Sequence, residues 1–429
     1  MRSLLIGSIP VHGHVSPLLG VARHFVERGD RVRFLTGSRF AESVAKTGAE
    51  FLPLPAEADF DDRQDFNETF PERKGLRGTK SASFDVVHLF TEPGRYQYAA
   101  VRAAHAAEPV DVLVGDPAFW GTLFLLGLPP AQRPALVIAG VLPLLMSSRD
   151  VGPAGMGLLP MRGPLGRLRN AAITTLVDRT VFAPVNRLTA EIFRELHGRQ
   201  IPFPTLDFMR RVDAYVQFTV REFEYPRSDA PPILHFAGPV SATGSAAPKP
   251  DWWGELDGSR PVVHVTQGTI GNKDFGQLVG PTLAALADED VLVAVATGGR
   301  PLETLPPLPA NARAAEYLPY DDLLPRTAVY VTNGGYGGVN YALRYGVPIV
   351  VTGGQEDKPE VAARVKWSGV GRRIRTDTPT PAQVRRAVRA VLDDPRYRTA
   401  ATGMAARMAA APGLAKLDEV VDHLAVIKG

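Results

Sequence analysis

Short apolar segments typical of buried strands alternate with longer segments of helical period, and this alternation runs twice along the chain. Strands joined by helical crossovers pair in parallel, and their continuous apolar runs indicate burial on both faces. The sequence therefore predicts an α/β fold of two Rossmann-like, doubly wound parallel sheets that face each other across a cleft. The predicted strands are 3–9, 32–35, 51–54, 110–114, 135–138, 214–218, 261–266, 291–296, 328–332 and 347–352.

Small residues and prolines without any periodicity occupy 240–251 ("VSATGSAAPKPD"), which is typical of a linker. We expect an N-terminal domain over 1–239, this linker, and a C-terminal domain over 252–405. A terminal helix over 406–429 is expected to pack back on the N-terminal domain. The other helices are expected at 17–27, 40–47, 278–286, 339–345, 359–367, 381–392 and 400–425.

The composition excludes several classes of protein. Apolar residues make up 45% of the chain and charged residues 22%, as in ordinary globular proteins, and no apolar run approaches 18 residues. We expect no membrane span. The net charge is only +3, without a dense block of Lys, Arg and aromatic residues, which argues against nucleic-acid binding. The chain has no cysteine, which fits a protein of the reducing cytoplasm. The sequence leaves the oligomeric state open.

Two stretches interrupt the alternation and are expected to be loops. Residues 56–82 are polar and charged, and residues 149–170 are rich in Gly, Pro and Met. Such long loops are either functional or floppy insertions, and methionine suits a surface that adapts to a bulky apolar partner.

Two histidines, His12 and His14, follow the first predicted strand in "IPVHGHVSPLLG". Ser16 and Pro17 come directly after them and are expected to cap and begin the next helix. The carboxyl ends of parallel strands carry the ligand sites of doubly wound sheets, so an imidazole here is a candidate catalytic group.

Glycine-rich turns follow three strands of the second half: 265–271, 296–301 and 331–338. The sequence "NGGYGG" at 333–338 lets backbone N–H groups approach an anion at the start of a helix. It lacks the lysine of a Walker A loop and the acid of a dinucleotide fingerprint. Further on, Asp357 lies between the end of another predicted strand and the start of a helix. A carboxylate there would repel phosphate and bind neutral hydroxyls. Together these features indicate a nucleotide-sugar.

The chain resembles the bacterial macrolide or antibiotic type of family 1 glycosyltransferases, which have the GT-B fold. The resemblance lies in "HGHVSPLLGVARHFVERGDRVRFLTG" near the start, in "VVHVTQGT" at 262–269, and in 317–365. These blocks keep the order and spacing of the family over nearly the whole chain.

The resemblance implies that His14 is the general base that deprotonates an acceptor hydroxyl and that Asp116 orients it. A carboxylate on the far ring nitrogen fixes the tautomer and stabilises the imidazolium as it forms. We expect the helix start at Ser16–Pro17 to oppose protonation of His14 beforehand. The acid pair Asp59–Asp61 resembles a metal site but is expected to be solvated surface.

The resemblance also implies an inverting transfer of a hexose that needs no metal and no resident cofactor. Helix N-terminal amides would take up the charge of the leaving nucleotide diphosphate. UDP-glucose is the expected donor, and a dTDP-sugar stays possible. The implied donor-binding residues are Thr269, Tyr317, Asn333, Gly334, Gly335, Gly337, Gly338, Gln355, Asp357 and Lys358.

The chain departs from the family pattern at four places. Asn333 replaces a histidine before the glycines, and Tyr341 replaces an acid that often holds the ribose. Tyr317 and Tyr320 stand where relatives have Trp and Gln around the base. Lys358 follows Asp357 where a glutamine is usual. These changes leave the nucleobase open.

The expected acceptor is a bulky hydrophobic natural product such as a macrolide or ansamycin, modified for inactivation or for biosynthesis. Two other functions stay open on sequence alone, a nucleotide-sugar epimerase and a catalytically silent nucleotide-sugar-binding protein of the same fold. Ten apolar side chains are expected to line the acceptor site, although each of them is also compatible with a core position. They are Phe60, Phe66, Phe70, Phe84, Phe90, Leu142, Met146, Met156, Leu159 and Met161.

Overall fold

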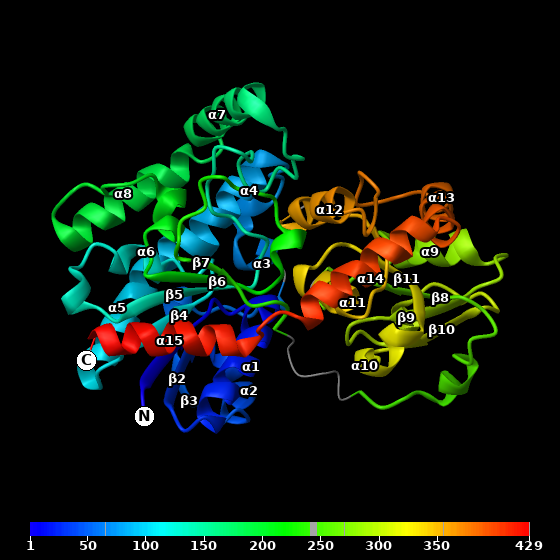
Figure 1. Cartoon of the computed structure of the whole chain (residues 1–429), viewed down its shortest axis with the longest axis horizontal. Coiled ribbons are helices and arrows are strands. Elements are labelled where there is room, and N and C mark those ends of the chain that lie inside the picture. Colours follow the sequence, from blue (N-terminus) through cyan, green and yellow to red (C-terminus); the bar gives the residue numbers. More distant parts are fainter. Residues whose placement is uncertain (65, 241–246, 270, 355, 429) are drawn as a thin grey trace.

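The computed structural model describes residues 1–64, 66–240, 247–269, 271–354 and 356–428, which form two parallel β-sheets (Figure 1). The first sheet has seven strands in the order β3-β2-β1-β4-β5-β6-β7, and the second has six in the order β10-β9-β8-β11-β12-β13. Helices lie on both faces of each sheet. The predicted fold class, two doubly wound α/β sheets in tandem, is confirmed.

The strands are short and mostly buried. In the N-terminal half they are β1 (Ser3–Gly7), β2 (Arg31–Thr36), β3 (Glu50–Pro53), β4 (Val112–Gly115), β5 (Ala135–Gly140), β6 (Ala214–Gln217) and β7 (Leu234–Phe236). In the C-terminal half they are β8 (Val262–Thr266), β9 (Leu292–Ala296), β10 (Ala312–Ala315), β11 (Thr327–Thr332), β12 (Ile349–Val351) and β13 (Gly371–Arg373).

Strands β7, β10 and β13 were not predicted, and each lies at a sheet edge. An edge strand pairs on one side only and is less deeply covered, so it needs no continuous apolar run. Strand β13, for example, reads Gly-Arg-Arg.

The helices of the N-terminal half are α1 (His12–Glu27), α2 (Ala41–Ala45), α3 (Phe66–Thr69), α4 (Thr79–Val86), α5 (Glu92–Ala107), α6 (Gly121–Leu125), α7 (Gly163–Arg179) and α8 (Ala183–His197). Those that follow are α9 (Val279–Leu286), α10 (Tyr320–Leu323), α11 (Tyr336–Arg344), α12 (Lys358–Trp367), α13 (Pro381–Leu392), α14 (Pro395–Ala409) and α15 (Leu414–Lys428).

The predicted start of α1 at Pro17 is wrong. The helix begins at His12 after the extended residue Val11, and Pro17 lies inside it. The carboxylate of Asp62 accepts the backbone N–H of His12 at 2.7 Å and so caps the first turn from a distant loop. His14 therefore lies in the first turn of a helix and not in the loop before it.

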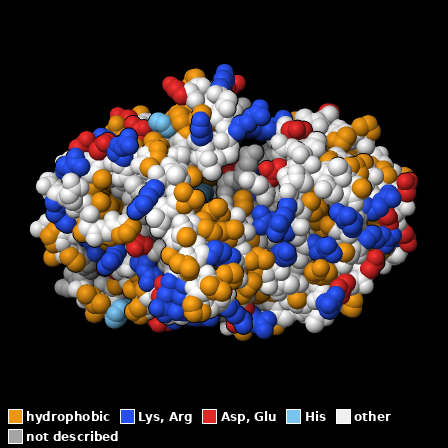
Figure 2. Space-filling view, turned by 90° about the horizontal axis from the view of Figure 1, so that it is seen from above, with side chains coloured by type: hydrophobic (Ala, Val, Ile, Leu, Met, Phe, Trp, Pro, Cys, Tyr) orange, Lys and Arg blue, Asp and Glu red, His pale blue; other side chains and the backbone are white. Residues whose placement is uncertain are grey.

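The two stretches predicted as loops are partly helical. Helices α3 and α4 interrupt 56–82, and α7 begins within 149–170. Helix α7 projects from the molecule, and Leu165, Leu168 and Leu176 on it are exposed. Figure 2, which views the molecule from that side, shows hydrophobic side chains gathered with Lys and Arg around them.

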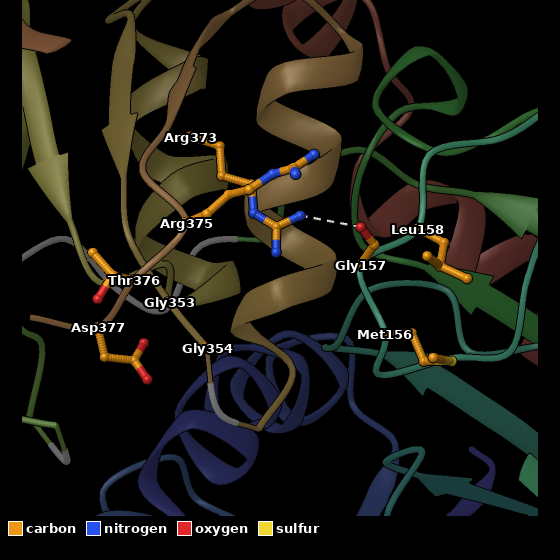
Figure 3. Close-up of a pocket in the computed structure, with 9 residues that line it drawn as sticks. All are labelled: Met156, Gly157, Leu158, Gly353, Gly354, Arg373, Arg375, Thr376 and Asp377. Carbon is orange, nitrogen blue, oxygen red and sulfur yellow. Dashed lines mark hydrogen bonds between the residues drawn. The ribbon is translucent and has the colours of Figure 1, made fainter. Parts of the chain in front are cut away.

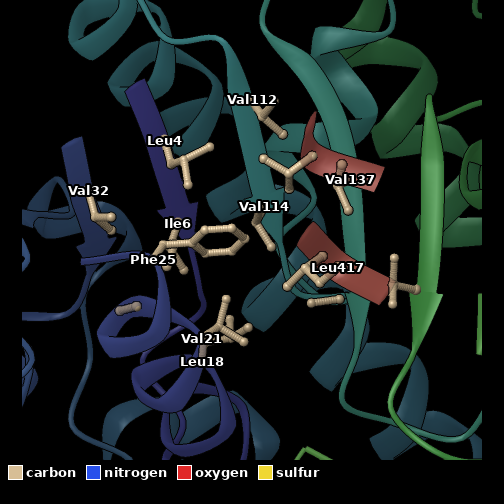
Figure 4. Packing of buried hydrophobic residues seen from close by; sticks show 14 of the residues in the cluster. Leu4, Ile6, Leu18, Val21, Phe25, Val32, Val112, Val114, Val137 and Leu417 are labelled. Carbon is tan, nitrogen blue, oxygen red and sulfur yellow. The ribbon is translucent and has the colours of Figure 1, made fainter. Parts of the chain in front are cut away.

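One hydrophobic core lies between the first sheet, helix α1 and the C-terminal helix α15 (Figure 4). Leu4, Ile6 and Val114 of the sheet and Phe25 of α1 are fully buried. So is Leu417 of α15. The chain crosses back through Gly413, whose N–H donates to the carbonyl of Ala237 at 2.7 Å. The helix that returns to the N-terminal half begins at Leu414 and not at 406.

The predicted linker 240–251 falls partly on residues 241–246, which lie outside the described residues. No helix in the described part of the chain is long and apolar enough to cross a bilayer.

Buried polar contacts join the two halves. The Oγ1 hydroxyl of Thr219 donates to Oδ1 of Asn340 at 2.6 Å, and Nε2 of Gln217 donates to the hydroxyl of Tyr336 at 2.8 Å. Buried polar groups are costly unless they are paired, so these contacts fix how the halves meet.

Candidate active site

The N-terminal part of the site forms where β1 and β4 end side by side. Gly7 and Gly115 are paired in register, and the next residue along β4 is Asp116. Asp116 donates its backbone N–H to the carbonyl of Gly7 at 3.1 Å. Parallel pairing thus brings the carboxylate to the edge where the chain turns into α1.

Three hydrogen bonds hold the Asp116 carboxylate, which is 1% exposed. Its Oδ2 accepts the N–H of Ile9 at 2.9 Å, and its Oδ1 accepts the N–H of Ala118 at 2.7 Å. Oδ1 also lies 2.9 Å from Nδ1 of His14. Because an ionised carboxylate only accepts, Nδ1 of His14 carries the hydrogen, and Nε2 is left as the basic nitrogen.

His14 is 9% exposed, and opposing effects act on its protonation. Burial lowers the pKa of His14, whereas the charge and hydrogen bond of Asp116 and the charges of Asp357 and Glu356 raise it, and the net pKa lies above the ordinary value. The helix start was expected to keep His14 unprotonated, but the net direction is set by these three carboxylates, which favour the imidazolium.

Asp62, which sequence reasoning missed, supports the same turn. It is 4% exposed, caps His12, and forms an ion pair with Arg39. Asp59 and Asp61, taken as solvated surface, are half-buried: Asp59 accepts the N–H of Ser38, and Asp61 pairs with Arg63. The described residues contain no group of three or more His, Asp or Glu that could hold a metal ion.

The C-terminal part of the site forms at the matching edge of the second sheet. Thr266 of β8, Thr332 of β11 and Val351 of β12 are paired in register at their carboxyl ends. The loops 267–269, 333–335 and 353–357 therefore start from one edge. Asn333 ties two of these loops, since its Nδ2 donates to the carbonyl of Gln267 at 2.8 Å.

The glycine turn is shorter than predicted. Only Gly334 and Gly335 precede α11, whereas Gly337 and Gly338 lie inside its first turn. Gly334 has φ 101°, a conformation that favours glycine. A Cβ on Gly338 would lie 2.8 Å from the hydroxyl of Tyr330, so this glycine serves packing. The N–H groups at the start of α11 still point toward the loop edge.

Lys358 lies between the loops. Its Nζ is 2.7 Å from Oε2 of Glu356 and would be 3.6 Å from a Cβ on Gly271. That Cβ would also approach Nδ2 of Asn333 to 2.5 Å, so the ammonium and the amide lie close together. Thr269 is exposed on the neighbouring loop. Gln355 lies outside the described residues.

The loop before α12 carries Asp357 and a backbone outlier. Glu356 has φ 58°, and it is the only non-glycine residue with a positive φ in the described part of the chain. Such strain often accompanies function. Burial is the main cause that raises the pKa of Asp357 to about 6, with a further contribution from Glu356. The charges of Lys358 and His14 act in the opposite direction, so Asp357 lies near enough to His14 of the other half for their charges to interact.

The tyrosines near the predicted base site have different surroundings. Tyr317 is 54% exposed, and a Cβ on Gly299 would meet its hydroxyl. Tyr320 packs against His264, whose Nε2 lies 3.0 Å from its hydroxyl. Tyr341 donates its hydroxyl to Oδ1 of Asp321 at 2.6 Å. An exposed aromatic face is thus present at Tyr317, whereas Tyr320 belongs to the packing.

The residues predicted for an acceptor mouth have mixed environments. Met146 is 1% exposed and belongs to the core. Met156 and Met161 are 45% and 39% exposed. Half-buried positions are held by Phe60, Phe66, Phe70, Phe84, Phe90, Leu142 and Leu159.

Known proteins resemble the chain throughout its length. Residues 281–427 match the family described as "Erythromycin biosynthesis protein CIII-like, C-terminal domain". The chain is 43% identical over 433 residues to 4'-demethylrebeccamycin synthase from Lentzea aerocolonigenes, covering 99% of each. The chain belongs to the family 1 glycosyltransferases of the bacterial antibiotic type.

One further relative supports this family, and a solved structure shows the fold. The glycosyltransferase is 31% identical over 433 residues to UDP-glucosyltransferase A1 from Starmerella bombicola, covering 98% of this chain and 92% of the relative. The solved structure of the glycotransferase of kitacinnamycin covers 99% of each chain with a TM-score of 0.75 at 20% identity, which shows the shared GT-B fold. The chain is therefore an enzyme, a glycosyltransferase of the type that acts in antibiotic and natural-product chemistry.

Proposed function

We propose that this glycosyltransferase moves glucose from UDP-glucose to a hydroxyl of a bulky apolar natural product, with inversion at the anomeric carbon. The observation that carries the proposal is the buried hydrogen bond that holds His14 on Asp116, with Asp357 of the opposite half near enough for its charge to act on His14. In this proposal the proton acceptor comes from the N-terminal half and the hydroxyl-binding carboxylate from the C-terminal half.

His14 is proposed as the general base. Its Nε2 takes the proton of the acceptor hydroxyl while the oxygen attacks the anomeric carbon and the bond to the nucleotide diphosphate breaks. Asp116 stabilises the imidazolium that forms, because its Oδ1 lies 2.9 Å from Nδ1. General base catalysis of this kind contributes about 100- to 10,000-fold to the rate.

The negative charge of the leaving diphosphate is proposed to fall on the loops of the second sheet. The free N–H groups at the start of α11, the exposed hydroxyl of Thr269 and the ammonium of Lys358 all lie around that edge. Asn333 supplies no charge, so Lys358 is the cation that offsets the developing charge.

The sugar is proposed to bind to Asp357, whose carboxylate accepts hydrogen bonds from hexose hydroxyls. The name of the Starmerella bombicola relative supports UDP-glucose. Tyr317, with its exposed ring, is proposed to stack on the pyrimidine, and a stacked ring does not distinguish uracil from thymine, so a dTDP-sugar is the second donor.

The acceptor is proposed to be a macrolide, an ansamycin or a molecule of similar bulk, which is either inactivated or tailored by the transfer. The exposed methionines of the 149–162 segment support an adaptable apolar surface.

The test is mass spectrometry of reactions that pair the enzyme with UDP-glucose, dTDP-glucose or dTDP-rhamnose and a panel of macrocyclic acceptors, with and without a chelator. The proposal predicts a gain of one hexose from UDP-glucose that the chelator leaves unchanged. Conversion of the sugar nucleotide without any acceptor product would contradict it and favour an epimerase.

A further inference from the structure

A pocket of about 520 Å³ lies between the two halves, next to Gly353 and Gly354 of the C-terminal half (Figure 3). Met156, Gly157 and Leu158 line it from the N-terminal half. The lining residues of the C-terminal half are Gly353, Gly354, Arg373, Arg375, Thr376 and Asp377. Its volume is in the range of pockets that bind small molecules. The proposed mechanism uses none of its charged side chains.

Hydrogen bonds that link the two halves build the wall of the pocket. The carbonyl of Gly157 accepts from Nη1 of Arg373 at 3.1 Å, and the N–H of Gly157 donates to Oε1 of Glu360 at 2.8 Å. Gly157 has φ 58°, and a Cβ there would lie 2.4 Å from the carbonyl of Pro359. The segment is therefore pressed against α12, and the pocket is a fixed feature of the interface.

Two guanidinium groups in the pocket lack a carboxylate partner in the described part of the chain. Nε of Arg373 is buried without a hydrogen-bond partner there, and Arg375 is exposed and forms no ion pair there. Burial and the like charge of Arg375 lower the pKa of Arg373 by more than the charges of Tyr225 and Glu360 raise it. Two neighbouring cations without an ion-pair partner, one of which keeps an unpaired buried donor, favour an anion.

The remaining side chains of the pocket limit the kind of anion that fits it. Asp377 also lines the pocket, and Figure 3 shows it directed toward Gly354 and away from the guanidinium groups. Two cations and one anion leave a net charge of +1, which matches a monoanion better than a phosphate ester. Met156 and Leu158 form an apolar wall opposite.

We infer that this pocket binds the carboxylate of an apolar carboxylic acid, with the acid group on Arg373 and Arg375 and the hydrocarbon part on Met156 and Leu158. The acid is either a free metabolite or part of the acceptor, and only the second case rests on the proposed function. Because the pocket shares the loop of Asp357, an acid bound there lies beside the donor site.

Calorimetric titration with octanoate, and with octanamide as its neutral counterpart, tests the inference on the whole enzyme without any donor. Octanoate should bind the wild type and lose about tenfold or more in affinity in Arg375→Gln, since a hydrogen bond to a charged group is lost. Arg372→Gln is the matched control, because Arg372 is an exposed arginine of β13, three residues before Arg375, and does not line the pocket. Octanamide should not distinguish the three proteins.

Equal binding of octanoate and octanamide to the wild type, or equal octanoate binding to all three proteins, would overturn the inference. A transfer assay with 8-hydroxyoctanoate as acceptor and UDP-glucose as donor distinguishes the two sources of the acid. Glucosylation that Arg375→Gln weakens identifies the acid as part of the acceptor, and binding without transfer identifies a free acid, and both support the pocket. Octanoate binding does not depend on turnover, so failure of the proposed function is seen separately.

Discussion

Among the neighbouring side chains, Asp116 has the largest effect on the protonation of His14. Asp116 raises the pKa of His14 against the effect of burial, and a general base acts only when it is unprotonated. The acidic limb of the pH profile of kcat/KM should therefore lie above the ordinary histidine value of about 6.5.

Asp116→Asn removes the charge that raises this pKa and leaves the burial that lowers it. The acidic limb of kcat/KM should move to lower pH, while the maximal rate falls because the imidazolium loses its stabilising partner. Rate measurements from pH 5 to 9 check this, with Asp59→Asn as a carboxylate control outside the His14 contacts. An acidic limb that stays in place would contradict the role given to Asp116.

Lys358 carries the proposed charge for the diphosphate. Lys358→Gln should weaken binding of UDP by about tenfold, as expected for loss of a charged partner, and leave binding of uridine nearly unchanged. Calorimetry with both ligands checks this, and Lys366→Gln, an exposed change on the same helix, is the control. Equal losses of affinity for UDP and uridine would contradict this role and show that Lys358 acts on the nucleoside or on folding.

At this scale the sequence predicted the residues that directly follow buried strands. Asp116 follows β4, and Asn333 follows β11, so their positions at the edges are visible in the apolar pattern. Asp62 and Glu356 were not predictable. Asp62 caps His12, which is 50 residues away, and no local pattern marks the positive φ of Glu356.

The elements that meet at the interface are held by buried charges. Arg364 of α12 is 1% exposed and contacts Glu224 of the N-terminal half and Glu360 of its own helix, both at 2.7 Å. Glu360 also holds Gly157. Helix α12, which begins next to Asp357, is thus fixed to the N-terminal half.

Arg364→Met leaves two buried carboxylates without a counter-ion and should lower the free energy of unfolding by about 3–5 kcal/mol. The triple variant Glu224→Gln, Glu360→Gln, Arg364→Met removes all three charges and should recover much of that loss. Urea unfolding of the three proteins checks this. A triple variant no more stable than the single one would show that unpaired charge is not the cause.

Element boundaries were predicted well where local signals agree with packing and poorly where they conflict. Helix α13 begins and ends where predicted, since Thr380 and Gln383 form a capping box before its apolar face. In α1 the Ser16–Pro17 signal is overridden, because Asp62 caps the helix earlier and Pro17 is accommodated in its second turn.

The whole molecule is closed by α15, which returns from the C-terminal half to the core of the first sheet. Leu417→Ala opens a cavity at a fully buried position and should cost about 2–5 kcal/mol of unfolding free energy. Val426→Ala on the same helix is 79% exposed before the change and should leave stability nearly unaltered. Thermal unfolding compares the two, and equal melting temperatures would contradict the packing described for α15.

The tandem sheets were predictable, because the strand–helix alternation appears twice in the sequence. The contacts between the halves were not predictable, because they pair residues such as Gly157 and Glu360 that are 203 positions apart and carry no shared signal. The pocket lined by Arg373 and Arg375 belongs to the same class, since it exists only where the halves meet.

The most direct test of the account is His14→Ala, measured for glucosyl transfer and for binding of UDP-glucose. The account predicts that transfer falls by about 100-fold or more while the dissociation constant of UDP-glucose stays as in the wild type, because the base contacts the acceptor and not the nucleotide. Turnover that survives the change would contradict the account and require another residue to take the proton.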